Sequence, residues 1–429
     1  MPEEHRFATR ALHAGQEPDP ATGSRAVPIY STVAYDFQST DHAARLFALQ
    51  ETGHIYSRIG NPTCRVLEER LADLEGGRAA LCFASGMAAI NAAILTITHN
   101  GQNFLSATSL YGGTWTAFTQ TFPRMGVEAR FFDPDRPQSI PALIDAETRC
   151  IYLESLGNPK CDIPDFRRIA EIAHSHGLPL IVDNTVLTPA LFRPLEHGAD
   201  IVLYSATKYI GGHGLHVGGA VVDGGRFDWC SNGGKWPELC RPDPAYHGLV
   251  FARDIPGAEE AAYATCMRVR WLRDTGACMS PFAAFLFLVG LETLHLRMPA
   301  HAANARDLAE WLEGHPAVQW VSYPGLPRHP HHAMAERYMP QGPGAIIGFE
   351  LQGGRKHGER FINAVKLASH CANIGDAKTL VVHPASTTHQ QLTEAEQAAA
   401  GVTPGFIRLC VGIEDVRDIR DDLDQAMRA

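Results

Sequence analysis

Short apolar runs alternate with helical stripes through the first two thirds of the chain. Residues 79–83, 150–153, 180–182 and 201–203 are apolar runs that predict buried strands. Residues 63–74, 86–97 and 166–176 have apolar positions at helical spacing, and the first and last stripes end at glycines. Strand and helix alternating at this spacing predict βαβ units and a mostly parallel sheet, which is an α/β fold.

The pattern differs on either side of this region. Residues 1–61 have weak periodicity with recurring Pro and Gly, which predicts a largely irregular arm. After residue 259 a long helical region continues to residue 311. A strand (346–351), a helix (359–367), a strand (379–382) and a C-terminal helix follow. We therefore expect an arm (1–62), a large domain (63–262) and a smaller α+β C-terminal domain (263–429).

Composition narrows the class of protein. The chain has 429 residues, 45% hydrophobic and 20% charged, which is ordinary for a soluble globular protein. Its net charge of −10 argues against a general binder of nucleic acid or anionic membranes. No apolar run reaches the ~18 residues that span a bilayer. The longest run, 281–291, predicts a buried core helix, and the charged first ten residues show no secretory signal.

Cysteine and histidine suggest no metal motif. The 10 cysteines include no Cys-x-x-Cys pair, so we expect free thiols in a reducing cytoplasm. The 21 histidines include a run at His329, His331 and His332. A metal site there stays open as an alternative, but the preceding Pro-Gly-x-Pro favours a polar surface loop.

Two predicted strands end in polar residues that point to chemistry. Asp183 follows one apolar run, and Lys208 lies just beyond the next. Ligands of a doubly wound sheet bind at the carboxyl ends of its strands, so the two residues can face one crevice. Pyridoxal phosphate (PLP) needs this pair, a lysine for the Schiff base and a carboxylate for the pyridine nitrogen. The alternative is a solvated lysine and a helix-capping aspartate.

Further residues could bind the phosphate and the ring of the same cofactor. Ser205 and Thr207 flank the lysine and can hydrogen-bond a phosphate. Gly86 and Met87 begin a predicted helix, whose free amides bind phosphate. Tyr111 is an aromatic residue on a glycine-flanked loop that could stack on a planar cofactor, and its alternative is a packed loop tyrosine. Asn158 follows a strand, and its alternative is an ordinary Asn-Pro turn.

These residues, taken in their order along the chain, resemble the motifs of the Cys/Met-metabolism family of PLP-dependent enzymes. The resemblance covers nearly the whole chain and is carried by residues 25–30, 56–58, 61–63, 85–87, 109–113, 182–185, 205–214, 383–389 and 407–414. It implies the PLP-dependent transferase fold, aspartate aminotransferase fold type I.

The resemblance also implies roles for individual residues. Lys208 would form the Schiff base and move protons, Asp183 would pair with the ring nitrogen, and Tyr111 would stack on the ring. The phosphate would be held by Gly86, Met87, Ser205 and Thr207, together with Tyr56 and Arg58 of a neighbouring subunit's arm. Arg408 would bind the substrate carboxylate as a bidentate fork, with Asn158 and Tyr56 beside it. Members are usually homotetramers, built as pairs of such dimers.

Within the family the chain is similar to the branch that acts on O-acetylhomoserine. Residues 13–17, 235–239, 244–249, 323–326 and 373–377 carry this similarity. It implies γ-replacement: sulfide or a small thiol displaces acetate, giving homocysteine or methionine. One alternative is a PLP-dependent γ-lyase for another amino acid, such as methionine or canavanine. Another is a non-catalytic PLP-binding or structural protein, which the set of Lys208, Asp183 and Arg408 disfavours.

Two pairs of residues depart from the family pattern, and one further position bears on the branch. Val186-Leu187 follows residues 183–185 where Phe-Ala is expected, and Leu215-His216 replaces small or hydroxyl residues. Both lie near the cofactor in sequence and could affect substrate choice. Gly113 stands where methionine γ-lyases carry a cysteine, which argues against that branch.

Overall fold

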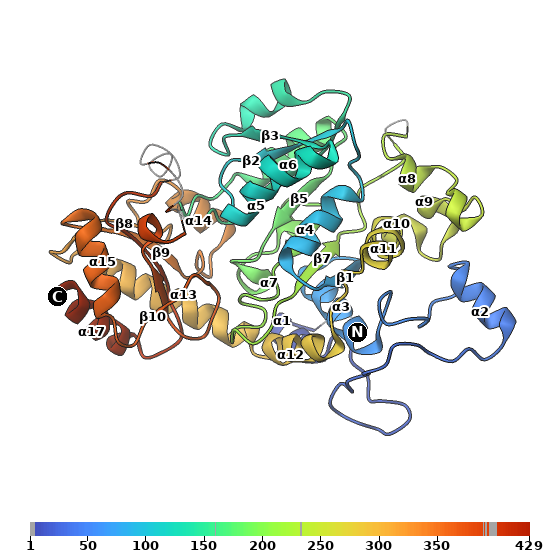
Figure 1. Ribbon diagram of the computed structural model, residues 1–429, viewed down its shortest axis with the longest axis horizontal. Helices are drawn as coiled ribbons and strands as arrows, with labels where there is room; N and C mark the ends of the chain where they lie inside the picture. Colours follow the sequence, from blue (N-terminus) through green and yellow to red (C-terminus); the bar gives the residue numbers. More distant parts are fainter. Residues whose placement is uncertain (1–4, 159, 232–233, 389, 391–392, 394–400) are drawn as a thin grey trace.

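A seven-stranded sheet forms the centre of the larger domain. The computed structural model describes residues 5–158, 160–231, 234–388, 390, 393 and 401–429 (Figure 1). The strand order is β1-β7-β6-β5-β4-β2-β3, and β7 runs antiparallel to both neighbours while the other pairs are parallel. The strands are β1 (Ala79–Phe83), β2 (Asn103–Ala107), β3 (Glu128–Phe132), β4 (Thr148–Glu154), β5 (Leu180–Asp183), β6 (Ile201–Tyr204) and β7 (Gly219–Asp223). The predicted mostly parallel α/β sheet is confirmed.

Both faces of this sheet are covered, which explains the near-continuous apolar strands. Side chains alternate along β6: Ile201 and Leu203 join one buried cluster, whereas Val202 and Tyr204 join the other. The first cluster packs under α4 (Gly86–Leu95) and α10 (Ala258–Met267). The second packs under α3 (Pro62–Glu75), α6 (Phe166–Ser175) and α12 (Pro281–Glu292), and it continues into the C-terminal domain.

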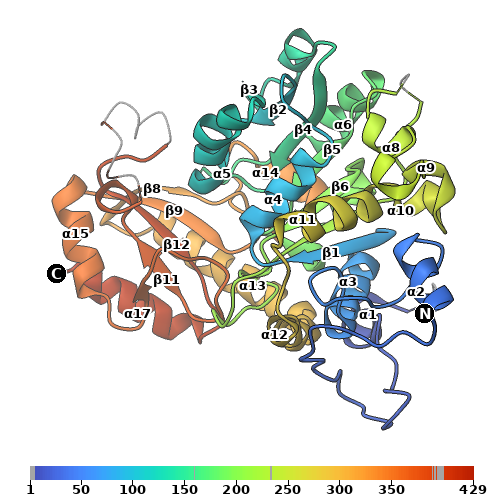
Figure 2. The ribbon, with the colours of Figure 1, turned by 45° about the vertical axis from the view of Figure 1, so that its right-hand side comes forward.

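The C-terminal domain contains a second sheet of five strands. Its order is β10-β11-β12-β9-β8, antiparallel except for β10 with β11. The strands are β8 (Val318–Ser322), β9 (Ile346–Leu351), β10 (Ser369–His370), β11 (Leu380–Val382) and β12 (Phe406–Cys410). Helices α13 (Leu294–Glu313) and α15 (Gly354–Ala364) pack on this sheet, and α17 (Val416–Met427) packs on both helices. The domain also contains α14 (His332–Tyr338). The predicted smaller α+β unit is therefore present (Figure 2).

Most predicted elements of regular structure lie within a few residues of their observed bounds. The strands predicted at 79–83 and 346–351 match β1 and β9. The helix predicted at 359–367 is displaced: α15 begins at Gly354 and ends at Ala364, because Gly353 (φ 92°) provides its left-handed start. Short helices complete the list: α5 (Gly112–Thr116), α7 (Thr188–Leu191), α8 (Pro237–Cys240), α9 (Phe251–Asp254) and α11 (Arg273–Thr275).

The N-terminal arm is less irregular than its sequence suggests. It contains α1 (Phe7–His13) and α2 (Thr40–Phe47), and Ser39 caps α2 by accepting the N–H of His42. Helix α1 packs on α3 and α12, whereas the segment around α2 extends away from the body of the subunit (Figures 1 and 2). The arm also exposes Val33 and Phe47. The described part of the arm is thus anchored at one end and projects at the other.

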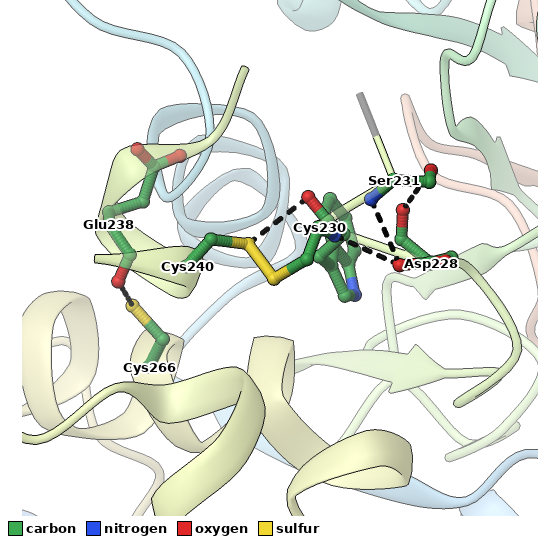
Figure 3. The surroundings of a disulfide bond; sticks show 7 residues. Asp228, Cys230, Ser231, Glu238, Cys240 and Cys266 are labelled. Atoms are coloured by element: carbon green, nitrogen blue, oxygen red, sulfur yellow. Dashed lines mark hydrogen bonds between the residues drawn. A yellow bond between two sulfur atoms is a disulfide. The ribbon is translucent and has the colours of Figure 1, made fainter. Parts of the chain in front are cut away.

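One expectation about cysteine is wrong. Cys230 and Cys240 form a disulfide, with Cα atoms 5.7 Å apart, whereas the other eight cysteines are free (Figure 3). The pairing depends on tertiary structure: Trp229 and Trp236 pack edge to face at 5.4 Å and fold this segment back on itself. A spacing of ten residues in sequence gave no sign of that contact.

The histidine run and the apolar helix can now be placed. His329 and His331 lie in turns before α14: His329 hydrogen-bonds Ser322, and His331 approaches Asp135 at 3.6 Å. Helix α12 buries Phe287 and Leu291 but exposes Phe282, so it is only partly the core helix that was predicted. Among the described residues no single helix is long and apolar enough to cross a membrane; α12 and α13 pass that test only as a pair bent by 62°.

Candidate active site

Asp183 and Lys208 lie at the carboxyl ends of neighbouring parallel strands. Asp183 is the last residue of β5, and Lys208 follows β6 by one turn. The Thr185 amide donates to Asp183 Oδ1 at 3.0 Å, and the Tyr152 hydroxyl donates to Oδ2 at 3.3 Å. Burial raises the pKa of Asp183 above its usual value, although Thr185 and Tyr152 favour the charged form. A positively charged group beside Asp183 would lower that pKa again.

The Lys208 amine points to the C-terminal domain. Its Nζ donates to Oδ1 of Asn373, at 2.5 Å, across the junction of the two domains. Burial lowers the pKa of Lys208, and the nearby Arg408 charge lowers it further. More of this amine is neutral near neutral pH than of a solvated lysine, so a larger fraction is available to act as a nucleophile or to accept a proton.

Arg408 joins the same cluster from β12. Its Nη2 lies 3.3 Å from the Asn373 carbonyl oxygen, and its Nη1 lies 3.4 Å from Oδ1 of Asn158. Both distances are long for a charged donor. The buried Nε has no hydrogen-bond partner among the described residues. This guanidinium thus retains donors for an anion, and the structure brings it together with Asn158 and Lys208.

The residues predicted to hold a phosphate lie together at the start of α4 and in the turn before Lys208. Ser85 caps this helix by accepting the Ala88 N–H, and a Cβ added at Gly86 would lie 2.8 Å from Cβ of Ser205. Glycine therefore lets the helix N-terminus approach the turn before Lys208. Met87 is partly buried beside it. The Thr207 hydroxyl donates to the Gly218 carbonyl and accepts from the Gly218 amide, so its contact with phosphate stays a prediction.

Tyr111 presents an exposed ring on a fixed main chain. The residue is 54% exposed, whereas its N–H donates to Oε1 of the buried Glu154 at 2.7 Å. A Cβ added at Gly113 would lie 2.4 Å from the Tyr111 ring, so a cysteine at residue 113 would displace the ring from this position. The loop is also tied at Ser109, which donates to Asp162 at 2.6 Å.

Tyr56 and Arg58 lie elsewhere in the subunit. The Arg58 guanidinium donates to the Arg273 carbonyl oxygen of α11 and lies 5.4 Å from the centre of the Tyr56 ring. Among the described residues, the contacts of this pair are therefore with α11 and the arm, not with the ends of β5 and β6. Their predicted role at a phosphate stays a prediction that needs a second subunit.

The two departures near the cofactor differ in position. Val186 and Leu187 are buried and pack toward Gly344, so they fill the core behind the site. Leu215 is 65% exposed, and His216 beside it has its ring 6.4 Å from Phe287. Val186 and Leu187 therefore change the packing of the core, whereas Leu215 and His216 change the surface.

Three residues of the cluster were given no role from sequence, although two of them, Thr185 and Asn373, lie in segments that carry the resemblance. Asn373 links Lys208 with Arg408, Thr185 links Asp183 with the Ser205 amide at 2.7 Å, and Glu154 holds the Tyr111 loop. Glu154 gave a signal, a charged residue ending an apolar strand next to the one that ends in Asp183. Asn373 lies in the segment 373–377 that carries the family similarity, but nothing in the sequence placed it beside Lys208, 165 residues away. Of the family segment 383–389, residue His389 lies outside the described residues.

Comparisons with known proteins cover the whole chain. The family model of Cys/Met metabolism PLP-dependent enzymes matches residues 8–428. A homocysteine synthase of Schizosaccharomyces pombe is 51% identical, with 99% of each chain covered. An O-acetyl-L-homoserine sulfhydrylase of Leptospira meyeri is 50% identical, covering 100% of this chain and 98% of its own. A crystal structure from Campylobacter jejuni, assigned as an O-acetylhomoserine (thiol)-lyase and carrying a pyridoxyl-lysine monophosphate, aligns at a TM-score of 0.94; it is 39% identical and covers 99% of this chain and 100% of its own.

Proposed function

Because this chain belongs to the family of Cys/Met metabolism PLP-dependent enzymes, we propose that it replaces the acetate of O-acetyl-L-homoserine with sulfide or a small thiol. The products are acetate and homocysteine, or methionine when the thiol is methanethiol. The observation that carries the proposal is that Asn373 accepts hydrogen bonds from both Lys208 and Arg408, and that Arg408 also reaches Asn158. This places an amine, a guanidinium and an amide around one point, as an amino-acid substrate requires.

The described residues fit pyridoxal phosphate. Lys208 is a partly buried amine with a lowered pKa, and Asp183 is a carboxyl group at the adjacent strand end. Gly86 lets a helix N-terminus approach Ser205, which suits a phosphate. The exposed Tyr111 ring provides a planar surface for the cofactor ring.

When bound, pyridoxal phosphate supplies a carbonyl carbon that joins amines and a ring that accepts electrons from the substrate. Lys208 Nζ takes up the proton from the substrate Cα, since burial keeps part of this amine neutral. Asp183 holds a proton at the ring nitrogen through its negative charge. Arg408 binds the substrate carboxylate with two parallel hydrogen bonds, and Asn158 orients the guanidinium.

A substrate assay tests the proposal. Purified holoenzyme is given O-acetyl-L-homoserine with and without sulfide, and acetate, homocysteine, keto acid and ammonia are measured. We expect acetate and homocysteine in equal amounts, and only when sulfide is present. Keto acid and ammonia formed without sulfide would instead identify a γ-lyase. Absence of acetate release would contradict the proposed substrate.

We also propose a homotetramer built from dimers that exchange their arms. Exposed apolar side chains support it, because exposed apolar surface is suited to contact with another subunit. They occur on the arm and on helices and loops elsewhere: Ile29, Val33, Phe37, Phe47, Leu215, Val217, Phe282, Val289 and Leu296.

We place the enzyme in the cytoplasm. The eight free cysteines support that location, whereas the Cys230–Cys240 disulfide counts against it.

A further inference from the structure

Two carboxyl groups end neighbouring strands on the same face of the large sheet. Glu154 is the last residue of β4, and its Cα is the register partner of Asp183 on β5. Tyr152 and Ile181, each two residues earlier, both belong to the cluster under α4, so Glu154 and Asp183 point to that face as well. Glu154 is 8% exposed. The proposed chemistry uses Asp183 and assigns nothing to Glu154.

Glu154 is the link between the sheet and the Tyr111 loop. Its Oε1 accepts the Tyr111 N–H at 2.7 Å, at the residue that precedes α5. Figures 1 and 2 show α5 on the side of the large sheet that faces the C-terminal domain. Because the Tyr111 ring is exposed, its own packing does not fix it, and the main chain at this residue must set where the ring lies.

The two carboxyl groups are in different electrostatic surroundings. Burial, and then the charge of Asp183, raise the pKa of Glu154 well above its usual value. Asp183 accepts hydrogen bonds from Thr185 and Tyr152 and would face the protonated ring nitrogen, all of which favour its negative charge. Two adjacent buried carboxylates cannot both ionise cheaply, so the proton stays on Glu154.

We propose that Glu154 is a positioning residue that, as a neutral acid, holds the Tyr111 main chain so that the tyrosine ring lies over the cofactor. Because Glu154 is neutral, Asp183 is the carboxylate of this pair that carries the negative charge beside the cofactor ring. The inference rests on the stacking role proposed for Tyr111. It does not depend on which amino acid is turned over or on whether sulfide is the nucleophile.

Two variants of Glu154 separate its shape from its charge. Glu154→Gln keeps an acceptor oxygen and is neutral, whereas Glu154→Ala removes the acceptor. The measurements are the dissociation constant of PLP and the visible circular dichroism of the bound cofactor, both without substrate. We expect Glu154→Gln to stay within about twofold of wild type and Glu154→Ala to weaken PLP binding about tenfold, since one hydrogen bond to a buried acceptor is lost. The dichroism should fall in the alanine variant only.

A matched control removes another buried carboxylate. Asp422 accepts the N–H groups of Lys366, Leu367 and Ala368 on the outer side of the C-terminal domain. Asp422→Ala should lower the thermal midpoint without changing PLP affinity or dichroism. This variant shows what loss of a main-chain acceptor does when the cofactor is not involved.

Two results would overturn the inference. One is a glutamine variant as impaired as the alanine variant, which would mean that the negative charge of Glu154 is needed. The other is an alanine variant with wild-type affinity and dichroism. If the alanine variant does not fold, a pH titration of the visible band decides the question. Coincident midpoints for wild type and Glu154→Gln support a neutral Glu154, and a shifted midpoint contradicts it. Because no substrate is used, a wrong substrate assignment would leave these results unchanged.

Discussion

The cluster of Asp183, Lys208 and Arg408 at the strand ends and the N-terminal arm differ in how many of their contacts lie within one subunit. At the strand ends, Asp183 and Lys208 are each held by hydrogen bonds within the subunit, to Thr185 and to Asn373. In the arm, Arg58 contacts α11, and Val33 is 61% exposed. The cluster is therefore preorganised by the core of its own subunit. The arm exposes apolar surface that a partner would cover.

This difference separates chemistry from assembly. Changes in the strand-end cluster should abolish activity whatever the oligomeric state. Changes in the arm should lower the activity of the neighbouring subunit's site, and mixing with chains that have an intact arm should restore that activity.

Lys208→Ala should have the largest effect. It removes the only amine placed at the end of β6 in the described structure, so activity should fall by about 10⁴-fold or more, and the visible band of the bound cofactor should shift. Steady-state assays and absorption spectra measure both. Residual activity above one part in a hundred, or a cofactor still trapped by borohydride, would remove Lys208 from its role.

Asp183→Asn should have the next largest effect. The amide keeps the shape of the side chain but cannot supply the negative charge for the ring nitrogen, so we expect kcat to fall about 10²- to 10³-fold while PLP still binds. PLP content after dialysis and initial rates give the two quantities. Near-normal kcat with full PLP content would show that Asp183 is not the ring partner.

A mixture of two inactive variants tests the arm. Lys208→Ala and Arg58→Ala chains, unfolded and refolded together, should regain roughly a quarter of wild-type activity if Arg58 completes the neighbouring site. Half of the dimers are then mixed, and each mixed dimer has one site with both residues intact. Native mass spectrometry must show the mixed dimers. Their presence without activity would contradict arm exchange.

His301 offers the smallest effect, on stability. This buried residue of α13 hydrogen-bonds the Val411 carbonyl oxygen, and burial lowers its pKa from 6.5 to about 4. The folded chain therefore binds its proton less readily than the unfolded chain. The contribution to stability is complete above pH 6.5 and is lost as the pH falls toward 4, by about 3 kcal/mol for this group.

Urea unfolding at pH 8 and at pH 5 measures this effect. Wild type should lose stability between the two values, and His301→Gln should lose less, because glutamine does not titrate. His13→Gln, which changes an exposed histidine of the arm, is the matched control and should follow wild type. An equal loss in all three proteins would show that other groups cause the acid sensitivity.

Sequence patterns predicted the parts of this fold whose interactions are local. Apolar strands between helical stripes gave the large sheet, and Gly76 in the left-handed region (φ 81°) ends α3 as expected. The displaced start of α15 and the short helices of the arm were missed because capping and packing decide them. The proposed boundary at residue 263 lies inside α10, which packs on β1 and β7, and it stays a prediction.

The sequence alone determined the fold class, the strand ends that carry Asp183 and Lys208, and the resemblance that implied the cofactor. These follow from periodicity and from motifs that are contiguous along the chain. Only the tertiary structure showed that Asn373 meets Lys208, that Glu154 holds Tyr111, and that Cys230 pairs with Cys240. Such contacts join residues on separate elements, and their partners depend on how strands register and domains dock. No local pattern encodes that information.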